Sequence, residues 1–135
     1  MQSILVFEED EVVRGLVQVI VESAGYFAVI AGNGEDALKI AQRGRISAIV
    51  LDCLAPSGEG VQALMRLRAD ATTTAIPVIA MCGLGQYGAE LGLWATSVLV
   101  KPFRASQLLL KLQYLVTRIQ PAETSNELHA LALAT

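Results

Sequence analysis

The sequence predicts an α/β protein in which a parallel sheet is covered by helices on both faces. Five short apolar runs alternate along the chain with five longer segments of helical periodicity, which is the pattern of repeated βα units. The apolar runs are nearly continuous rather than alternating with polar residues, as expected for strands that are buried on both faces. Charged residues stand where three of these runs end, so we expect the chemistry at the carboxyl ends of the strands, where an open parallel sheet forms its ligand crevice.

The expected elements can be placed from their hydrophobic pattern and from the turn residues between them. Gly25 is expected to follow the end of the first helix as its C′ glycine. Pro102 cannot donate a hydrogen bond to a sheet, so the fifth strand is expected to stop at Lys101. Strands are expected at residues 3–7, 27–31, 46–51, 77–81 and 98–100. Helices are expected at residues 11–23, 34–42, 58–69, 86–93 and 105–119.

Length and composition indicate one domain. The chain of 135 residues is long enough for a single core but too short for two. We assign residues 1–120 to the domain and residues 121–135 to a C-terminal tail or linker that can form a further helix.

Several functional classes are disfavoured by composition. The apolar fraction is 53%, yet no apolar stretch approaches the roughly 18 residues of a membrane span. The first residues lack the basic segment of a signal peptide, so a cytoplasmic location is expected. A net charge of −3 argues against a nucleic-acid surface in this segment.

The charged residues at the strand ends predict a phosphate-handling pocket. Glu8, Glu9 and Asp10 follow the first apolar run, Asp52 follows the third, and Lys101 ends the fifth. Because the carboxyl ends of parallel strands lie side by side, these groups are expected to share one pocket. Packed carboxylates repel one another unless a cation lies among them, and hard oxygen ligands favour Mg²⁺. Carboxylate, Mg²⁺ and lysine together are the groups that handle a phosphoryl group.

Four segments resemble the receiver (CheY-like) domain of two-component response regulators. They are residues 4–10, residues 48–60, residues 77–81 and Lys101-Pro102-Phe103, and the resemblance extends over about residues 3–119. It implies a flavodoxin-like, doubly wound sheet of five parallel strands in the order 2-1-3-4-5. It also implies a non-enzymatic protein that accepts a phosphoryl group from a histidine kinase or phosphotransfer protein and thereby controls a protein partner or output.

The resemblance also implies roles for particular residues. Asp52 falls on the phosphoacceptor, and Lys101 falls on the lysine that contacts the phosphoryl group. Mg²⁺ would be held by Glu9, Asp52 and the backbone carbonyl of Leu54, with Glu8 acting through water. The peptide bond before Pro102 is usually cis in this family. The simpler alternatives are that Asp52 is a loop carboxylate capping the next helix and that Lys101 is a solvated lysine.

Three positions depart from the receiver pattern and leave a second interpretation open. Glu9 stands where receivers commonly have Asp, Cys82 stands at the Ser/Thr switch position, and Val98 stands at the aromatic switch position. The alternative is therefore a pseudo-receiver, a protein-interaction module that works without phosphorylation. A flavin or dinucleotide site is disfavoured because the loop after the first strand is acidic and not rich in glycine.

The two cysteines allow a redox alternative. Cys82 would be a reactive thiol if the neighbouring Lys101 lowered its pKa, although a buried cysteine acting as a small hydrophobe is the commoner case. Cys53 follows Asp52 and is expected on the opposite face from the pocket, so we expect no Cys53–Cys82 disulfide.

Apolar residues on the last two helices suggest a partner surface. More of them are present than one sheet face needs, and the fourth helix, fifth strand and fifth helix would then form a homodimer interface. The alternative is that these side chains fill the core. They are Leu84, Tyr87, Leu91, Leu93, Trp94, Leu109, Leu110, Tyr114 and Val116.

Overall fold

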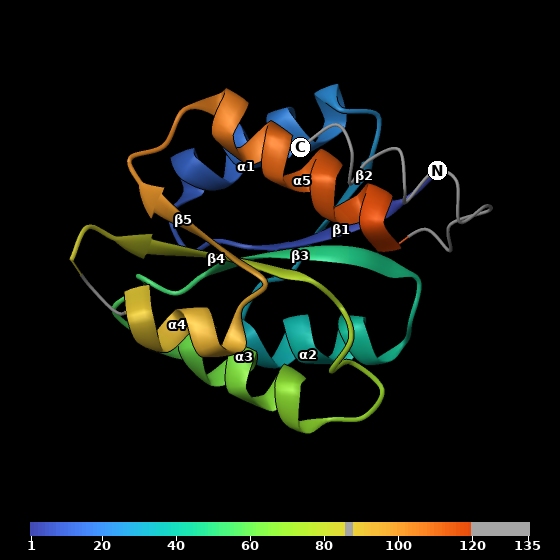
Figure 1. The fold of residues 1–135 in the computed structure, drawn as a ribbon, viewed down its shortest axis with the longest axis vertical. Helices are drawn as coiled ribbons and strands as arrows, with labels where there is room; N and C mark the ends of the chain where they lie inside the picture. The colour runs from blue at the N-terminus through green and yellow to red at the C-terminus, as the bar shows by residue number, and fades with distance from the viewer. Residues whose placement is uncertain (86–87, 120–135) are drawn as a thin grey trace, which may run out of the picture.

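The structure is a computed structural model that describes residues 1–85 and 88–119, and it alternates strands with helices as expected (Figure 1). Tyr87 and the tail at residues 121–135 lie outside the described residues. The strands are β1 (Ser3–Phe7), β2 (Phe27–Ile30), β3 (Ile46–Asp52), β4 (Val78–Gly83) and β5 (Ser97–Lys101). The helices are α1 (Glu11–Ser23), α2 (Gly34–Gln42), α3 (Glu59–Ala69), α4 (Gly88–Trp94) and α5 (Ala105–Ile119).

The five strands form one parallel sheet in the order β2-β1-β3-β4-β5. Helices α1 and α5 cover one face, and α2, α3 and α4 cover the other (Figure 1). This arrangement confirms the predicted doubly wound α/β fold and its strand order. None of the described helices is both long and apolar enough to span a membrane.

The core consists of two layers, one on each face of the sheet. Side chains alternate along β1, so Ile4 and Val6 pack in the layer under α1 and α5, whereas Leu5 and Phe7 pack in the opposite layer. All four are at most 1% exposed. Burying a side chain of this size contributes about 1.5–3 kcal/mol. Burial on both faces explains why the central strands appear in the sequence as continuous apolar runs.

Local polar contacts fix the turn that leads from β1 into α1. Asp10 is the N-cap of α1 and accepts hydrogen bonds from the backbone N–H groups of Val12 (2.9 Å) and Val13 (3.0 Å). At the other end, Gly25 adopts a φ of 89°, which favours glycine and closes the helix as predicted. The cap at Asp10 holds the loop containing Glu8 and Glu9 at the carboxyl end of the sheet.

The structure corrects the predicted end of the fourth strand. We expected that strand to stop at Met81, but β4 continues through Cys82 to Gly83 and pairs with β5 over that length. Cysteine and glycine carry weak strand signals, so the sequence pattern ended too early. As a result, Cys82 is part of the buried sheet and not of a loop.

Candidate functional site

Charged side chains at the carboxyl ends of β1, β3 and β5 meet in one pocket, as predicted. The Lys101 ammonium lies 2.5 Å from Oε1 of Glu8 and 3.3 Å from Oδ1 of Asp52. A shallow pocket of about 300 Å³ opens above them. Its lining residues are Glu8, Glu9, Asp10, Asp52, Leu54, Ala55, Pro56 and Lys101.

Asp52 is fixed by backbone donors from two loops. Its Oδ1 accepts hydrogen bonds from the N–H groups of Leu54 (3.0 Å) and Ala55 (3.1 Å), and its Oδ2 accepts one from the N–H of Glu9 at 3.3 Å. Asp52 is only 2% exposed and ends β3. It does not cap α3, because the N-cap of that helix is Gly58, so this alternative is wrong.

Asp52 is nevertheless held in its charged form. Burial alone would raise its pKa, but the hydrogen bond with Glu8, the charge of Lys101 and the backbone donors together lower the pKa below its usual value. An ionised carboxylate in a fixed orientation is the form that acts as a nucleophile.

The pKa of Glu8 is shifted in the opposite direction from that of Asp52. It is 1% exposed, and its Oε2 accepts a hydrogen bond from the N–H of Asp10 at 2.9 Å. Burial and the neighbouring Asp52 raise the pKa of Glu8 to about 7, although Lys101 acts in the opposite direction. In the structure Glu8 binds Lys101 directly, and its expected contribution to Mg²⁺ binding through water stays a prediction. No local sequence pattern indicates that this carboxylate is buried.

Lys101 is not a solvated surface residue, so that alternative is wrong as well. Its side chain is 18% exposed and contacts both buried carboxylates. Burial tends to lower its pKa, but Glu8 and Asp52 raise the pKa overall, so the ammonium stays charged. The peptide bond between Lys101 and Pro102 is cis, as the resemblance implied.

Glu9 lies at the exposed rim of the pocket. Its Oε1 accepts a hydrogen bond from the hydroxyl of Ser57 at 2.5 Å, which links the loop after β1 to the loop after β3. Ser57 was not among the residues singled out from the sequence. Its position five residues after the acid at the end of the third strand was the available signal.

The donor set is compatible with Mg²⁺, although it is not arranged as a complete metal site. Within residues 1–85 and 88–119, no group of three or more His, Cys, Asp or Glu side chains is placed to hold a metal ion. Glu9 and Asp52 nevertheless supply two carboxylates to one pocket, and Leu54 is among the residues that line it. Mg²⁺ usually keeps several waters and takes only one or two carboxylates. These residues therefore fit the ion, provided that Glu9 releases Ser57.

Gly60 is a second residue that the sequence reasoning missed. A Cβ atom built on it would lie 1.7 Å from the carbonyl oxygen of Asp52. Only glycine therefore lets the first turn of α3 pack directly against the backbone of Asp52. The helix consequently helps to set the position of the carboxylate.

The switch-position residues face the core and not the pocket. Cys82 is 1% exposed and packs in the layer under α2, α3 and α4, and the half-buried Val98 packs against the same layer. The alternative in which Lys101 lowers the pKa of Cys82 is wrong, because burial raises the pKa of this thiol. Neither side chain supplies the hydroxyl that a Ser or Thr would bring.

The two cysteines lie on the same face of the sheet, so the reason given for expecting no disulfide between them does not hold. Cys53 does point away from the pocket, as its place after Asp52 predicts, but Cys82 packs in the same core layer. Both cysteines are free thiols. Burial raises the pKa of Cys53 to about 12, with a smaller contribution from the negative charge of Asp52.

The sequence is similar to the receiver domains of known response regulators. The sequence model of the response regulator receiver domain matches residues 4–113. The phosphate regulon transcriptional regulatory protein PhoB of Pseudomonas aeruginosa is 27% identical over 91% of this chain and 55% of its own length. The DNA-binding dual master transcriptional regulator RpaA of Synechocystis is 32% identical over 87% of this chain and 50% of its own length. The chain thus spans about half the length of these relatives.

Solved structures agree with the sequence match. The receiver domain of the sensor histidine kinase PA1611 from Pseudomonas aeruginosa, crystallised with a magnesium ion in its active-site cleft, superposes with a TM-score of 0.77. It is 28% identical, and the match covers 86% of this chain and 98% of that domain. A receiver domain from a Syntrophus aciditrophicus histidine kinase has a TM-score of 0.80 at 23% identity, covering 92% of this chain and 96% of that one; this second likeness shows the fold alone.

Proposed function

This chain belongs to the response regulator receiver domain family, and from that premise we propose that Asp52 accepts a phosphoryl group from a histidine kinase or a phosphotransfer protein. The observation that supports this most directly is the buried, ionised Asp52 held 3.3 Å from the Lys101 ammonium. The protein would act as a phosphoryl acceptor that controls a partner or output, and not as an enzyme with its own substrate.

Each residue of the pocket has a separate role in this reaction. An oxygen of Asp52 forms a bond to phosphorus while the bond from phosphorus to the donor's imidazole nitrogen breaks, which leaves an acyl phosphate. The N–H groups of Leu54 and Ala55 hold the attacking carboxylate in place. Lys101 lies where it can neutralise the added negative charge. Mg²⁺ held by Glu9, Asp52 and the Leu54 carbonyl would screen the charge repulsion between carboxylate and phosphoryl group.

The pseudo-receiver remains the second candidate. The exposed Glu9 bonded to Ser57 and the buried thiol at Cys82 favour it, because they weaken metal binding and remove the switch hydroxyl. Incubation with Mg²⁺ and acetyl phosphate, followed by intact mass measurement, separates the two. Phosphorylation predicts the added mass of one phosphoryl group, which Asp52→Asn abolishes. An unmodified mass together with no Mg²⁺-dependent change in the NMR spectrum would leave only the pseudo-receiver.

The output of the signal is proposed to come from outside this segment. The relatives are transcriptional regulators twice as long as the matched region, whereas this chain carries a net charge of −3. We therefore propose that it does not itself contact nucleic acid. The two free thiols are consistent with a reducing, cytoplasmic location.

We also propose that a second copy of this chain docks on the surface formed by α4, β5 and α5. The apolar residues of this region are divided: Leu91 and Val116 are buried, whereas Leu93 (82%), Leu110 (65%) and Tyr114 (52%) are strongly exposed. The core-filling alternative thus accounts for only some of them.

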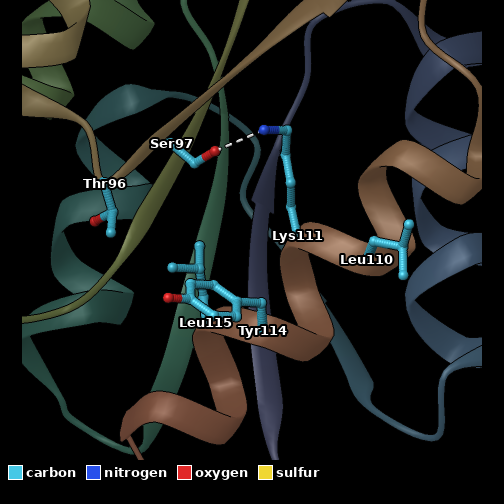
Figure 2. Close-up of a pocket in the computed structure, with 6 residues that line it drawn as sticks. All are labelled: Thr96, Ser97, Leu110, Lys111, Tyr114 and Leu115. Carbon is cyan, nitrogen blue, oxygen red and sulfur yellow. Dashed lines mark hydrogen bonds between the residues drawn. The ribbon is translucent and has the colours of Figure 1, made fainter. Parts of the chain in front are cut away.

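A pocket of about 370 Å³ lies on the same surface, between the start of β5 and one side of α5 (Figure 2). Lys101 of the charged site is at the other end of that strand. Lys111 crosses it and donates a hydrogen bond to the hydroxyl of Ser97 at 2.9 Å. Its lining residues are Thr96, Ser97, Leu110, Lys111, Tyr114 and Leu115. In the described sheet, β5 is an edge strand, and edge strands that carry exposed apolar side chains tend to be covered by another chain.

Analytical ultracentrifugation over a range of concentrations tests the dimer. Leu110→Glu should shift the protein toward monomer, whereas Val12→Glu, which changes a still more exposed residue on α1 (82%), should not. A wild-type protein that stays monomeric at high concentration contradicts the proposal.

A further inference from the structure

Cys53 and Cys82 are neighbours across two adjacent parallel strands. Asp52 of β3 pairs with Met81 of β4, and the N–H of Cys53 donates a hydrogen bond to the carbonyl of Met81 at 2.8 Å. The ladder therefore continues one residue beyond the end of β3. This places Cys53 beside Cys82, and both side chains belong to the same core layer.

The backbone spacing at this position suits a disulfide. Adjacent strands lie about 4.8 Å apart, and disulfides join Cα atoms that are roughly 4.4–6.8 Å apart. The two thiols are 4% and 1% exposed, so no other protein can readily reach them, but each can reach the other. The spacing of the strands, the position of both side chains on one face of the sheet and their burial thus all favour a disulfide within the chain over one between two chains.

We propose that Cys53 and Cys82 form a dithiol that a hydroperoxide oxidises to an internal disulfide. The Cys82 sulfur attacks the peroxide oxygen, its proton passes to the leaving oxygen, and a sulfenic acid and one molecule of alcohol or water result. The Cys53 sulfur then attacks the Cys82 sulfur, and the hydroxide that leaves takes the Cys53 proton as water. The two thiols lose two electrons and two protons, and the peroxide bond is reduced.

Cys82 is assigned the first step because of its place at the end of β4. It is followed by the partly buried Gly83 and by Leu84, which is 89% exposed, so a small oxidant has a short path to it. Cys53 is followed by two partly buried residues, Leu54 and Ala55, before the chain reaches the exposed Pro56, so the path to it is longer. Since both thiols are buried, the oxidation is expected to be slow compared with that of an exposed thiolate.

The cross-link would fix the distance between the carboxyl ends of β3 and β4. Cys53 directly follows Asp52, and Cys82 occupies the switch position, so the bond would connect the phosphoacceptor segment to the strand that must respond to it. The proposal goes beyond the phosphoacceptor function and does not require it, because its readout is the state of two thiols and not the phosphorylation of Asp52.

The test treats the folded chain of 135 residues with hydrogen peroxide, removes the oxidant, unfolds the protein and alkylates the remaining thiols. The reduced protein should take up two alkyl groups. The oxidised monomer should take up none and should weigh two hydrogens less, and a reductant should restore both thiols. Proteolysis should release one cross-linked peptide pair containing Cys53 and Cys82.

Single variants provide the matched controls. Cys82→Thr, which places the receiver family's residue at this position, and Cys53→Ala should each leave one thiol that is alkylated after the same treatment. The peptide map of the wild-type protein gives the answer even if one variant does not fold. Oxygen added separately to the cysteines, a disulfide between two chains, or two thiols still alkylatable after prolonged oxidation would each overturn the proposal.

Discussion

The Lys101 ammonium lies 2.5 Å from the Glu8 carboxylate, which is closer than the 3.3 Å that separates it from Asp52. The charge of Lys101 is therefore already shared with a buried acid beside the proposed phosphoacceptor. A phosphoryl group on Asp52 would compete with Glu8 for that ammonium. Because Glu8 has a pKa near neutrality, of about 7, it can take up a proton when Lys101 turns away from it. Glu8 is thus expected to compensate for changes in charge at the site.

The stability of the protein should fall between acid and neutral pH because of Glu8. Its pKa is raised from 4.5 to about 7 on folding, so the folded state binds the proton more tightly than the unfolded state. This contribution is fully present below pH 4.5 and is lost as the pH rises through 7. The total is at most on the order of 3 kcal/mol.

Glu8→Gln tests this assignment. The neutral amide mimics the protonated acid, so the variant should be more stable than the wild type at pH 8, by about 1–3 kcal/mol, and similar to it near pH 5. Urea unfolding at the two pH values gives the comparison. Parallel stability curves for the two proteins between pH 5 and pH 8 would contradict the raised pKa.

Mg²⁺ affinity should depend on the hydrogen bond between Glu9 and Ser57. Because that bond at 2.5 Å must break before Glu9 can hold a metal, Ser57→Ala should bind Mg²⁺ more tightly, by roughly threefold to tenfold, which is about 0.7–1.4 kcal/mol. Glu9→Asp should act in the same direction, since the shorter side chain does not reach Ser57. Isothermal titration calorimetry measures both variants. An affinity that is unchanged or lower in Ser57→Ala would show that Glu9 is not a ligand.

Gly60 should tolerate no side chain. A Cβ atom there would overlap the carbonyl oxygen of Asp52 at 1.7 Å, so Gly60→Ala should destabilise the fold by about 2–3 kcal/mol or more and displace Asp52. Gly15 on α1 is the matched control, because a Cβ atom there meets nothing within 4 Å. Gly15→Ala should stabilise the helix by about 0.5–1 kcal/mol. Thermal unfolding of both variants provides the measurement, and equal stabilities would contradict the proposed close approach.

The sequence was informative where a local pattern had one structural outcome. Acidic and basic residues at the ends of apolar runs predicted that Asp52, Glu8 and Lys101 would meet, because parallel strands align their carboxyl ends. Asp10 before a helical pattern and Gly25 after it marked the ends of α1. These signals depend on short stretches of chain and on sheet geometry that is common to the fold class.

The remaining features depend on contacts between distant segments. Nothing near Glu8 indicates that it is buried against Lys101, which lies 93 residues away. The shared facing of Cys53 and Cys82 required the β3–β4 register, which no single strand encodes. The close contact of Gly60 with Asp52 likewise appears only when α3 is packed on the sheet. The residues that make up the site could thus be predicted, but which of them contact one another could not.

Arg68 should be the most important charged residue for the stability of the fold outside the pocket. Its guanidinium donates hydrogen bonds to the carbonyls of Trp94 (2.6 Å), Ile76 (2.7 Å) and Thr74 (3.0 Å), so it joins the end of α3 to the segments that flank β4 and β5. A lysine ammonium cannot reproduce the planar set of N–H donors of the guanidinium. Arg68→Lys should therefore lower the free energy of unfolding by about 2 kcal/mol. Arg66→Lys is the control, because Arg66 forms an exposed ion pair with Glu35, and such pairs contribute only about 0–1 kcal/mol. Urea unfolding should separate the two variants, and equal losses would contradict a structural role specific to Arg68.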